Sequence, residues 1–284
     1  MKNTIELYNH HHNGDVFYSR VLVNSLLNDY NIIFYHNLNV PLFSDLNGVT
    51  EIYGVPNHMT QENTDIDNKI INTWIGQQKL KYLLSQNPGC NFNNYFELVK
   101  DILTRLNLPI KDKYNHLPTI NFIGVPNYGD ILNQVLFLKN NYKKLILISN
   151  GNVHSGQSSN FNMDNTILRL SEENQDCLFL ITHNINHDKS NIIYVNNITK
   201  ILPDLLQIGL ISTYCDIIVG RASGPHCFTH IKENLIDKNK TFISFTNNHT
   251  EGKWFLESKS KQIWSNDYTN ENVYNLINNE IKLK

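Results

Sequence analysis

Residues 5–35 read IELYNHHHNGDVFYSRVLVNSLLNDYNIIFY, and this stretch indicates the fold class. Its opening residues form a strand-like run, and from Val16 to Asp29 the apolar residues recur at helical spacing. A second apolar run, from Ile32 to Tyr35, is typical of a buried strand. A strand, a helix and a strand in this order make a βαβ unit, which predicts a parallel sheet.

The rest of the first unit carries weaker signals. Residues 37–56 are rich in turn-forming residues, and Lys69 to Trp74 read as one further strand. The residues from Tyr95 to Leu106 have helical spacing, and Pro109 ends that helix. Residues 111–127 read as the connection to a second unit.

The second half of the chain alternates short apolar runs with helical segments. Strands are expected at residues 145–149, 177–182, 191–195, 217–220 and 241–245. Helices are expected at residues 165–173, 201–212, 225–236 and 271–281. Strict alternation predicts parallel strands with helices on both faces. We therefore expect an α/β protein of two Rossmann-like domains, residues 1–122 and 123–284.

Composition limits the classes of partner. The chain has 284 residues and a formal net charge of −2, so it has no overall basic charge to attract nucleic acid. Its four cysteines form no CxxC pair, which argues against a zinc cluster or a disulfide framework. No apolar run reaches the ~18 residues of a membrane helix, and none near Met1 is long enough for a signal peptide. We expect a cytoplasmic protein.

The loop from Asn9 to Asp15 is the first candidate site, because ligands gather at the carboxyl ends of parallel strands. Asp15 can act as a general base, since deprotonating a hydroxyl needs a carboxylate or an imidazole within hydrogen-bond reach. The alternative for Asp15 is a simple helix N-cap. The other candidates in this loop are His10, His11, His12 and Asn13. Consecutive histidines do not share one side of a strand or helix, which argues against a metal site here.

Two loops of the second unit could hold an anion. The loop after Ile217–Gly220 offers Arg221, Ser223, Gly224, Pro225 and His226, and a helix start there would present unpaired N–H groups. The loop after the first strand offers Ser149, Gly151 and Ser155, and Thr182 ends the next strand. The alternatives are a helix cap with an arginine that pairs structurally, and a flexible surface turn.

Two motifs resemble a known family. Asn13-Gly14-Asp15-Val16, between a strand and an apolar helix, resembles the opening of the lipopolysaccharide heptosyltransferases of the GT-B glycosyltransferase class. Ser223-Gly224-Pro225-His226 is similar to their donor motif Asp-Ser/Thr-Gly-x-x-His, but Ala222 stands at the acidic position and His226 comes one residue early. The family's lysine for the donor phosphate has no counterpart, and Arg221 is the candidate substitute.

The resemblance implies a GT-B fold, in which two Rossmann-like domains face a cleft, and a hexosyl- or heptosyltransferase-like enzyme. Asp15 would be the catalytic base with His12 in reserve, and the rest of the first loop would bind the acceptor. The expected reaction moves a sugar from a nucleotide-sugar co-substrate to a hydroxyl of a glycan or other acceptor, without a metal or another cofactor. A sugar-nucleotide epimerase or hydrolase of the same fold is one alternative. A non-catalytic glycan- or nucleotide-binding module, favoured by Ala222, is the other.

Overall fold

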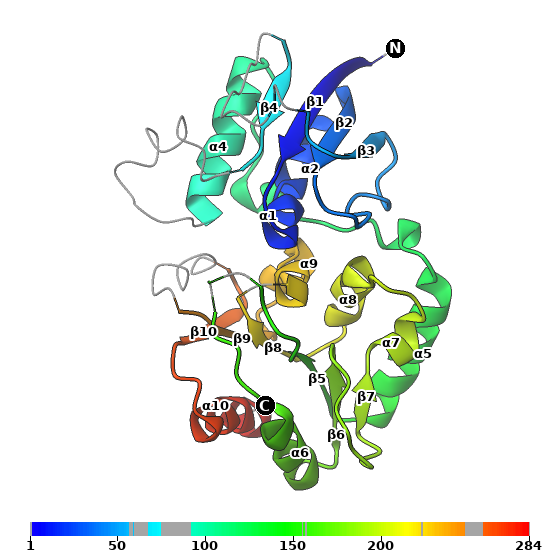
Figure 1. Ribbon diagram of the computed structural model, residues 1–284, viewed down its shortest axis with the longest axis vertical. Helices are drawn as coiled ribbons and strands as arrows, with labels where there is room; N and C mark the ends of the chain where they lie inside the picture. Colours follow the sequence, from blue (N-terminus) through cyan, green and yellow to red (C-terminus); the bar gives the residue numbers. More distant parts are fainter. Residues whose placement is uncertain are drawn as a thin grey trace. The chain divides into compact units, whose positions relative to one another are not determined.

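The computed structural model describes residues 2–56, 59, 68–74, 92–154, 156, 158–222, 224–247 and 258–283. Contacts between Cα atoms divide the chain into two compact units, Met1–Gly124 and Val125–Lys284. The first unit therefore ends at residue 124, where the sequence predicts 122. Each unit is an α/β structure in which the strand pairs of the described residues are all parallel (Figure 1).

The first unit contains a four-stranded sheet with the strand order β3-β2-β1-β4. The strands are β1 (Asn3–Asn9), β2 (Tyr30–His36), β3 (Val49–Tyr53) and β4 (Ile70–Asn72). The helices are α1 (Asn13–Tyr18), α2 (Arg20–Leu26) and α4 (Phe92–Arg105), and the short 3-10 helices are η2 (Lys113–His116) and η3 (Phe122–Gly124). Strand β3 lies where the sequence predicts only turns, because this edge strand is largely exposed and lacks an apolar run.

The helix predicted from Val16 to Asp29 is two helices that meet at Ser19. The Ser19 hydroxyl donates to the backbone carbonyl of Asp15 at 3.2 Å, and the Ser19 N–H donates to the carbonyl of Val16. A serine that bonds back to the preceding turn competes with the regular helical pattern and bends the helix. The break places Ser19, which is fully buried, beneath the loop that follows β1.

The second unit contains a six-stranded sheet with the order β10-β9-β8-β5-β6-β7. The strands are β5 (Lys144–Ser149), β6 (Cys177–Ile181), β7 (Ile192–Tyr194), β8 (Ile217–Arg221), β9 (Thr241–Phe245) and β10 (Lys261–Ser265). The helices are α5 (Tyr128–Asn141), α6 (Asp164–Glu173), α7 (Asn196–Thr199), α8 (Leu205–Ser212), α9 (Lys232–Leu235) and α10 (Asn270–Leu283), with the 3-10 helix η4 (Gly224–Thr229). Numbered from β5, this order is the 3-2-1-4-5-6 order of a Rossmann sheet.

The core of the second unit explains its clear sequence signal. Strands β5, β6, β8 and β9 are buried along their whole length, so they read as continuous apolar runs. One face packs against α6 and α10, whose apolar residues join those of the strands in a single cluster. Figure 1 shows α5 and α8 on the other side of the sheet. The sequence analysis predicts no strand at β10, because β10 is a partly exposed edge strand with polar residues.

One predicted helix is wrong in a way that affects the site. The segment expected as a helix at residues 225–236 is the 3-10 helix η4 followed by the short helix α9. Ile231 between them has an extended backbone, and the Thr229 hydroxyl donates to the carbonyl of His226 at 2.6 Å. A six-residue 3-10 helix does not align enough peptide dipoles to form the anion-binding helix start that the sequence predicts.

Candidate active site

In each sheet the chain first adds strands on one side of the first strand and later reverses and adds strands on its other side. In the first unit β2 and β3 lie on one side of β1 and β4 lies on the other; in the second unit β8 is the strand that follows on the far side of β5. Ligands of open α/β sheets bind outside the carboxyl ends of the strands at such a reversal. The residues after β1 and β4, and those after β5 and β8, are therefore the places to search.

Asp15 lies at the carboxyl end of β1, in the first turn of α1. The N-cap of α1 is His12, so the interpretation of Asp15 as an N-cap is wrong. The Asp15 carboxyl group is half-buried, and this burial raises its pKa. Several neighbours oppose this shift because they favour the charged carboxylate. They are the His12 ring, the backbone N–H groups of His12 and Asp15, and the side chain of Trp74. A carboxyl group with a raised pKa is suited to accept a proton near neutral pH.

A buried polar network supports this loop from below. The Asn9 amide donates to the hydroxyl groups of Ser19 and Thr73, each at 3.3 Å, and those two hydroxyl groups lie 2.6 Å apart. The Tyr95 hydroxyl donates to the carbonyl of Thr73 at 3.2 Å, and the Asn9 side-chain oxygen accepts from the backbone of His11 at 3.0 Å. The network joins the ends of β1 and β4 to α4, so it fixes the backbone on which Asp15 stands.

Aromatic rings from the loops after β1 and β4 pack against one another. The His11 ring stacks on Trp74, with 3.7 Å between ring centroids and 27° between ring planes, and the His10 ring lies 4.3 Å from His11. Burial, together with neighbouring His10 and His12, lowers the pKa of His11 to about 4, so this ring is neutral at pH 7. Buried polar atoms of His10 (Nδ1), His11 (Nε2) and Asn13 (Oδ1) have no hydrogen-bond partner among the described residues.

The first loop thus combines a carboxylate, a neutral stacked imidazole and buried polar atoms that have no hydrogen-bond partner in the part of the chain that the structure describes. His12, the predicted reserve base, is exposed. The sequence prediction gives neither Thr73 nor Trp74 a role in the site, although both lie at the end of the strand that it predicts from Lys69 to Trp74; in the structure they directly follow β4. Their position could have been marked as a strand-end loop, but only the order β1-β4 brings that loop to Asp15.

The two loops that the sequence predicts to bind the donor come together at the reversal in the second unit. Ser149 ends β5 and Thr182 follows β6, and the hydroxyl oxygen of each is buried without a partner among the described residues. The Asn150 side chain bridges the two strand ends, since it donates to the carbonyl of His183 and accepts from its N–H, each at 2.8 Å. Gly151 lies next to this bridge. The predicted residues Ser155 and Ser223 lie outside the described residues.

The Arg221 side chain is buried and donates its hydrogen bonds to backbone carbonyls of the protein. Its side chain is 1% exposed and donates to the carbonyls of Asn150 at 2.9 Å, of Gly151 at 2.5 Å, and of Phe161. The guanidinium also lies 4.6 Å from the centre of the Phe161 ring, and burial lowers its pKa. These contacts make Arg221 a clamp on the loop after β5.

His226 lies in the core, with no exposed surface. Its Nε2 is 2.8 Å from the Ser244 hydroxyl, and burial lowers the pKa of the ring to about 3. A Cβ on Gly220 would lie 2.7 Å from the His226 ring, so β8 requires glycine there. Gly224 and Pro225 are half-exposed at the start of η4, and Gly224 has a φ of +53°, a conformation that favours glycine.

Solved structures share this architecture. A glycosyl transferase of family 9 from Veillonella parvula DSM 2008 is similar over 99% of this chain and 89% of that chain, with a TM-score of 0.54 and 10% identity. The E. coli ADP-heptose lipopolysaccharide heptosyltransferase II is similar over 100% of this chain and 99% of that chain, with a TM-score of 0.50 and 12% identity. The chain has the GT-B fold. No family model and no curated protein matches its sequence.

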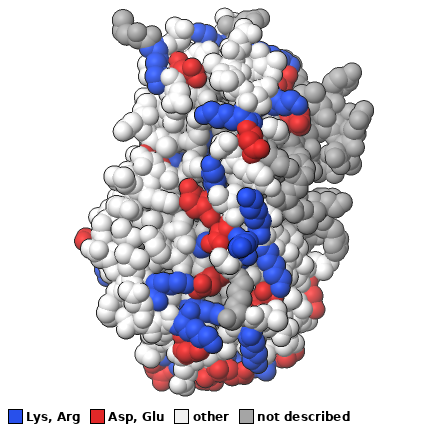
Figure 2. Space-filling view, turned by 180° about the vertical axis from the view of Figure 1, so that it is seen from behind, with Lys and Arg blue, Asp and Glu red and all other residues white. Residues whose placement is uncertain are grey.

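The GT-B fold expected from the two motifs is therefore confirmed, although 10–12% identity identifies the fold alone. Within the described ranges, no three His, Cys, Asp or Glu side chains converge on a point where they could hold a metal ion. Across the same ranges no helix combines the length and the apolar character needed to span a membrane. Figure 2 shows basic and acidic side chains interleaved on one face of the chain.

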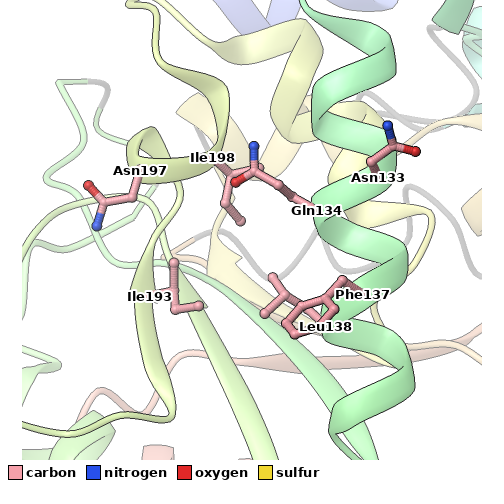
Figure 3. A pocket seen from close by; sticks show the side chains of 7 residues that line it. All are labelled: Asn133, Gln134, Phe137, Leu138, Ile193, Asn197 and Ile198. Carbon is pink, nitrogen blue, oxygen red and sulfur yellow. The ribbon is translucent and has the colours of Figure 1, made fainter.

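A separate groove of about 480 Å³ lies in the second unit, between α5 and the segment of β7 and α7. Its lining is uncharged and consists of Asn133, Gln134, Phe137, Leu138, Ile193, Asn197 and Ile198 (Figure 3). No predicted site residue of this GT-B chain lines the groove. It is therefore not the donor site that the sequence predicts.

Proposed function

We propose that the chain is a metal-independent glycosyltransferase that moves a sugar from a nucleotide-sugar to a hydroxyl of a glycan or other acceptor. The observation that supports this proposal most is the position of Asp15, a half-buried carboxyl group with a raised pKa beside the point where the sheet reverses between β1 and β4. The GT-B fold is compatible with this chemistry, but function depends on the site and not on the fold.

In the proposed reaction the acceptor hydroxyl attacks the anomeric carbon of the donor. The new bond joins the acceptor oxygen to the sugar, and the bond between the sugar and the nucleoside diphosphate breaks. Asp15 takes the hydroxyl proton, and the diphosphate leaves with the bonding electrons. His12 is the reserve base, and His10, His11 and Asn13 contact the acceptor through their buried polar atoms.

On the donor side, the hydroxyl groups of Ser149 and Thr182, the backbone at Gly151 and Gly224 and the ring of Pro225 are the proposed contacts, with Ser155 and Ser223 from the same loops. Arg221 and His226 take a different part. The buried contacts of Arg221 support a role in holding the Asn150–Gly151 loop. The burial of His226 against Gly220 supports a role in holding β8 and the start of η4.

The first experiment identifies the donor. Thermal unfolding is measured with a panel of nucleoside diphosphates, because a ligand at ~100 times its Kd stabilises a protein by about 2.7 kcal/mol. The matching nucleotide-sugars are then tested with an acceptor panel, comparing the natural chain with Asp15→Asn. Removal of a general base lowers the rate by about 10²–10⁴-fold, and full activity of Asp15→Asn would exclude Asp15 as the base.

The same experiment separates the alternatives. Epimerisation or hydrolysis of the donor without an acceptor would favour the epimerase or hydrolase. Binding of a nucleotide-sugar without turnover on any acceptor would favour a binding module, which Ala222 at the family's acidic position makes a specific second candidate.

A further inference from the structure

We propose that Trp74 is a positioning residue that holds the Asp15 carboxylate and the His11 ring in one arrangement. Trp74 follows β4, whereas Asp15 and His11 follow β1, and the parallel pairing of these strands brings the three side chains together. The catalytic meaning of this role rests on the proposed function, but the contacts are present in the chain by itself.

The indole group acts on Asp15 through a hydrogen bond. The indole N–H is the only polar group of a tryptophan side chain and can only donate. The hydrogen bond from the Trp74 side chain favours the charged form of Asp15, so it lowers the pKa of a carboxyl group whose pKa burial raises. Trp74 therefore keeps the base ionised over a wider pH range.

The face of the same indole acts on His11. The two rings stack at 3.7 Å, and the His10 ring lies 4.3 Å from His11 on the same loop. Because the indole covers one face of His11, it contributes to the burial that keeps this imidazole neutral. A neutral imidazole has both a donor and an acceptor nitrogen, so His11 can bind an uncharged hydroxyl beside the carboxylate. This arrangement fits an uncharged sugar as the acceptor.

Other titratable groups act on this pair and must be followed in the same experiment. His12 acts on both Asp15 and His11, and His10 acts on His11. On α4, burial and the neighbouring Asp15 raise the pKa of the Tyr95 hydroxyl, so it stays protonated throughout. Assignment of the histidine signals therefore uses single His→Gln variants of the loop.

The test compares Trp74→Phe with Trp74→Ala in the full chain. Phenylalanine keeps a flat ring against His11 but has no N–H, whereas alanine removes both contacts. The matched control is Trp264→Phe in the second unit, where the indole nitrogen has no partner among the described residues. Side-chain carboxyl and imidazole groups are titrated by NMR in the resting protein, with Asp15→Asn used to assign the Asp15 signal.

We expect Trp74→Phe to move the Asp15 titration to higher pH and to leave His11 near its pKa of about 4. We expect Trp74→Ala to move His11 toward the ordinary value of 6.5 as well. The acid limb of the transfer rate should follow the Asp15 titration in each variant. Trp264→Phe should change neither group.

An Asp15 titration that is the same in Trp74→Phe and the natural chain would overturn the positioning role, whatever the activity. If Trp74→Phe does not fold, the indole N–H signal of the natural chain decides: it should move as Asp15 titrates, and in Asp15→Asn it should no longer respond. A signal indifferent to both would also overturn the role. Full transfer by Asp15→Asn would instead refute the proposed function and leave the contacts of Trp74 intact.

Discussion

The buried contacts of Arg221 lead to a prediction that distinguishes two roles for this residue: holding the loop after β5 in place, and binding a phosphate group directly. Its guanidinium donates to three backbone carbonyls, of Asn150, Gly151 and Phe161, and is 1% exposed. Arg221→Met keeps much of the side-chain length and removes every donor. The three carbonyls would then lose their charged partner, and the loop after β5 would lose its support.

The expected loss of stability follows from these contacts. Hydrogen bonds that involve a charged group contribute about 1.5–3 kcal/mol each, and release of the guanidinium from burial offsets part of their sum. Each buried carbonyl left without a partner costs about 1–3 kcal/mol, so for the three carbonyls, less this offset, we expect Arg221→Met to lower the unfolding free energy by about 3–5 kcal/mol. Arg221→Lys should lose about half, because a lysine ammonium group cannot reproduce the planar fork of a guanidinium.

Denaturant unfolding measures this loss, followed by fluorescence in a Trp74→Phe background, where the two remaining tryptophans, Trp254 and Trp264, both belong to the second unit. Arg169→Met is the control, since this exposed arginine pairs with exposed Glu173 and Glu271 and lies over the Tyr274 ring, and its loss should cost about 1 kcal/mol.

Binding of a nucleoside and of its diphosphate is measured alongside, and a misplaced loop should weaken both. Unchanged stability of Arg221→Met, with weaker binding of the diphosphate alone, would refute the clamp and favour direct contact with phosphate.

Two further predictions concern the buried histidine of the second unit. Gly220→Ala should cost about 1–3 kcal/mol by overpacking, since its Cβ would lie 2.7 Å from the His226 ring; in a double-mutant cycle His226→Ala should relieve much of that cost, and additive losses would contradict the contact. Because the folded pKa of His226 is about 3 and its ordinary value is 6.5, the unfolded chain binds the extra proton between these values. The unfolding free energy should therefore rise as the pH increases from 4 to 7, and the rise should be smaller in His226→Gln; equal slopes would contradict it.

Much of the fold could be predicted from the sequence because burial leaves a local mark. Strands β5, β6, β8 and β9 are covered on both faces, so each appears as an apolar run. Edge strands leave no such mark: β3 and β10 have one side open to solvent and polar residues within them. The sequence prediction therefore finds the centre of each sheet and misses an edge of each.

The site divides in the same way. The sequence by itself determined that a polar loop with Gly14 and Asp15 follows a buried strand and opens a helix, since strand, loop and helix are adjacent in the chain. It could not determine which loop lies beside it, because the neighbour of β1 depends on strand order, and 58 residues lie between Asp15 and Trp74 in the chain.

The tertiary structure alone decided what the charged and aromatic side chains contact. The Arg221-to-His226 segment offers donors that suit a phosphate, but in the folded chain the arginine donates to carbonyls of the β5 loop and the histidine packs on Gly220. Trp74, unremarkable in the sequence, reaches both Asp15 and His11. The physical reason is that hydrophobic patterning specifies which residues are buried, whereas the partner of a buried polar group is fixed by packing between segments far apart in the chain.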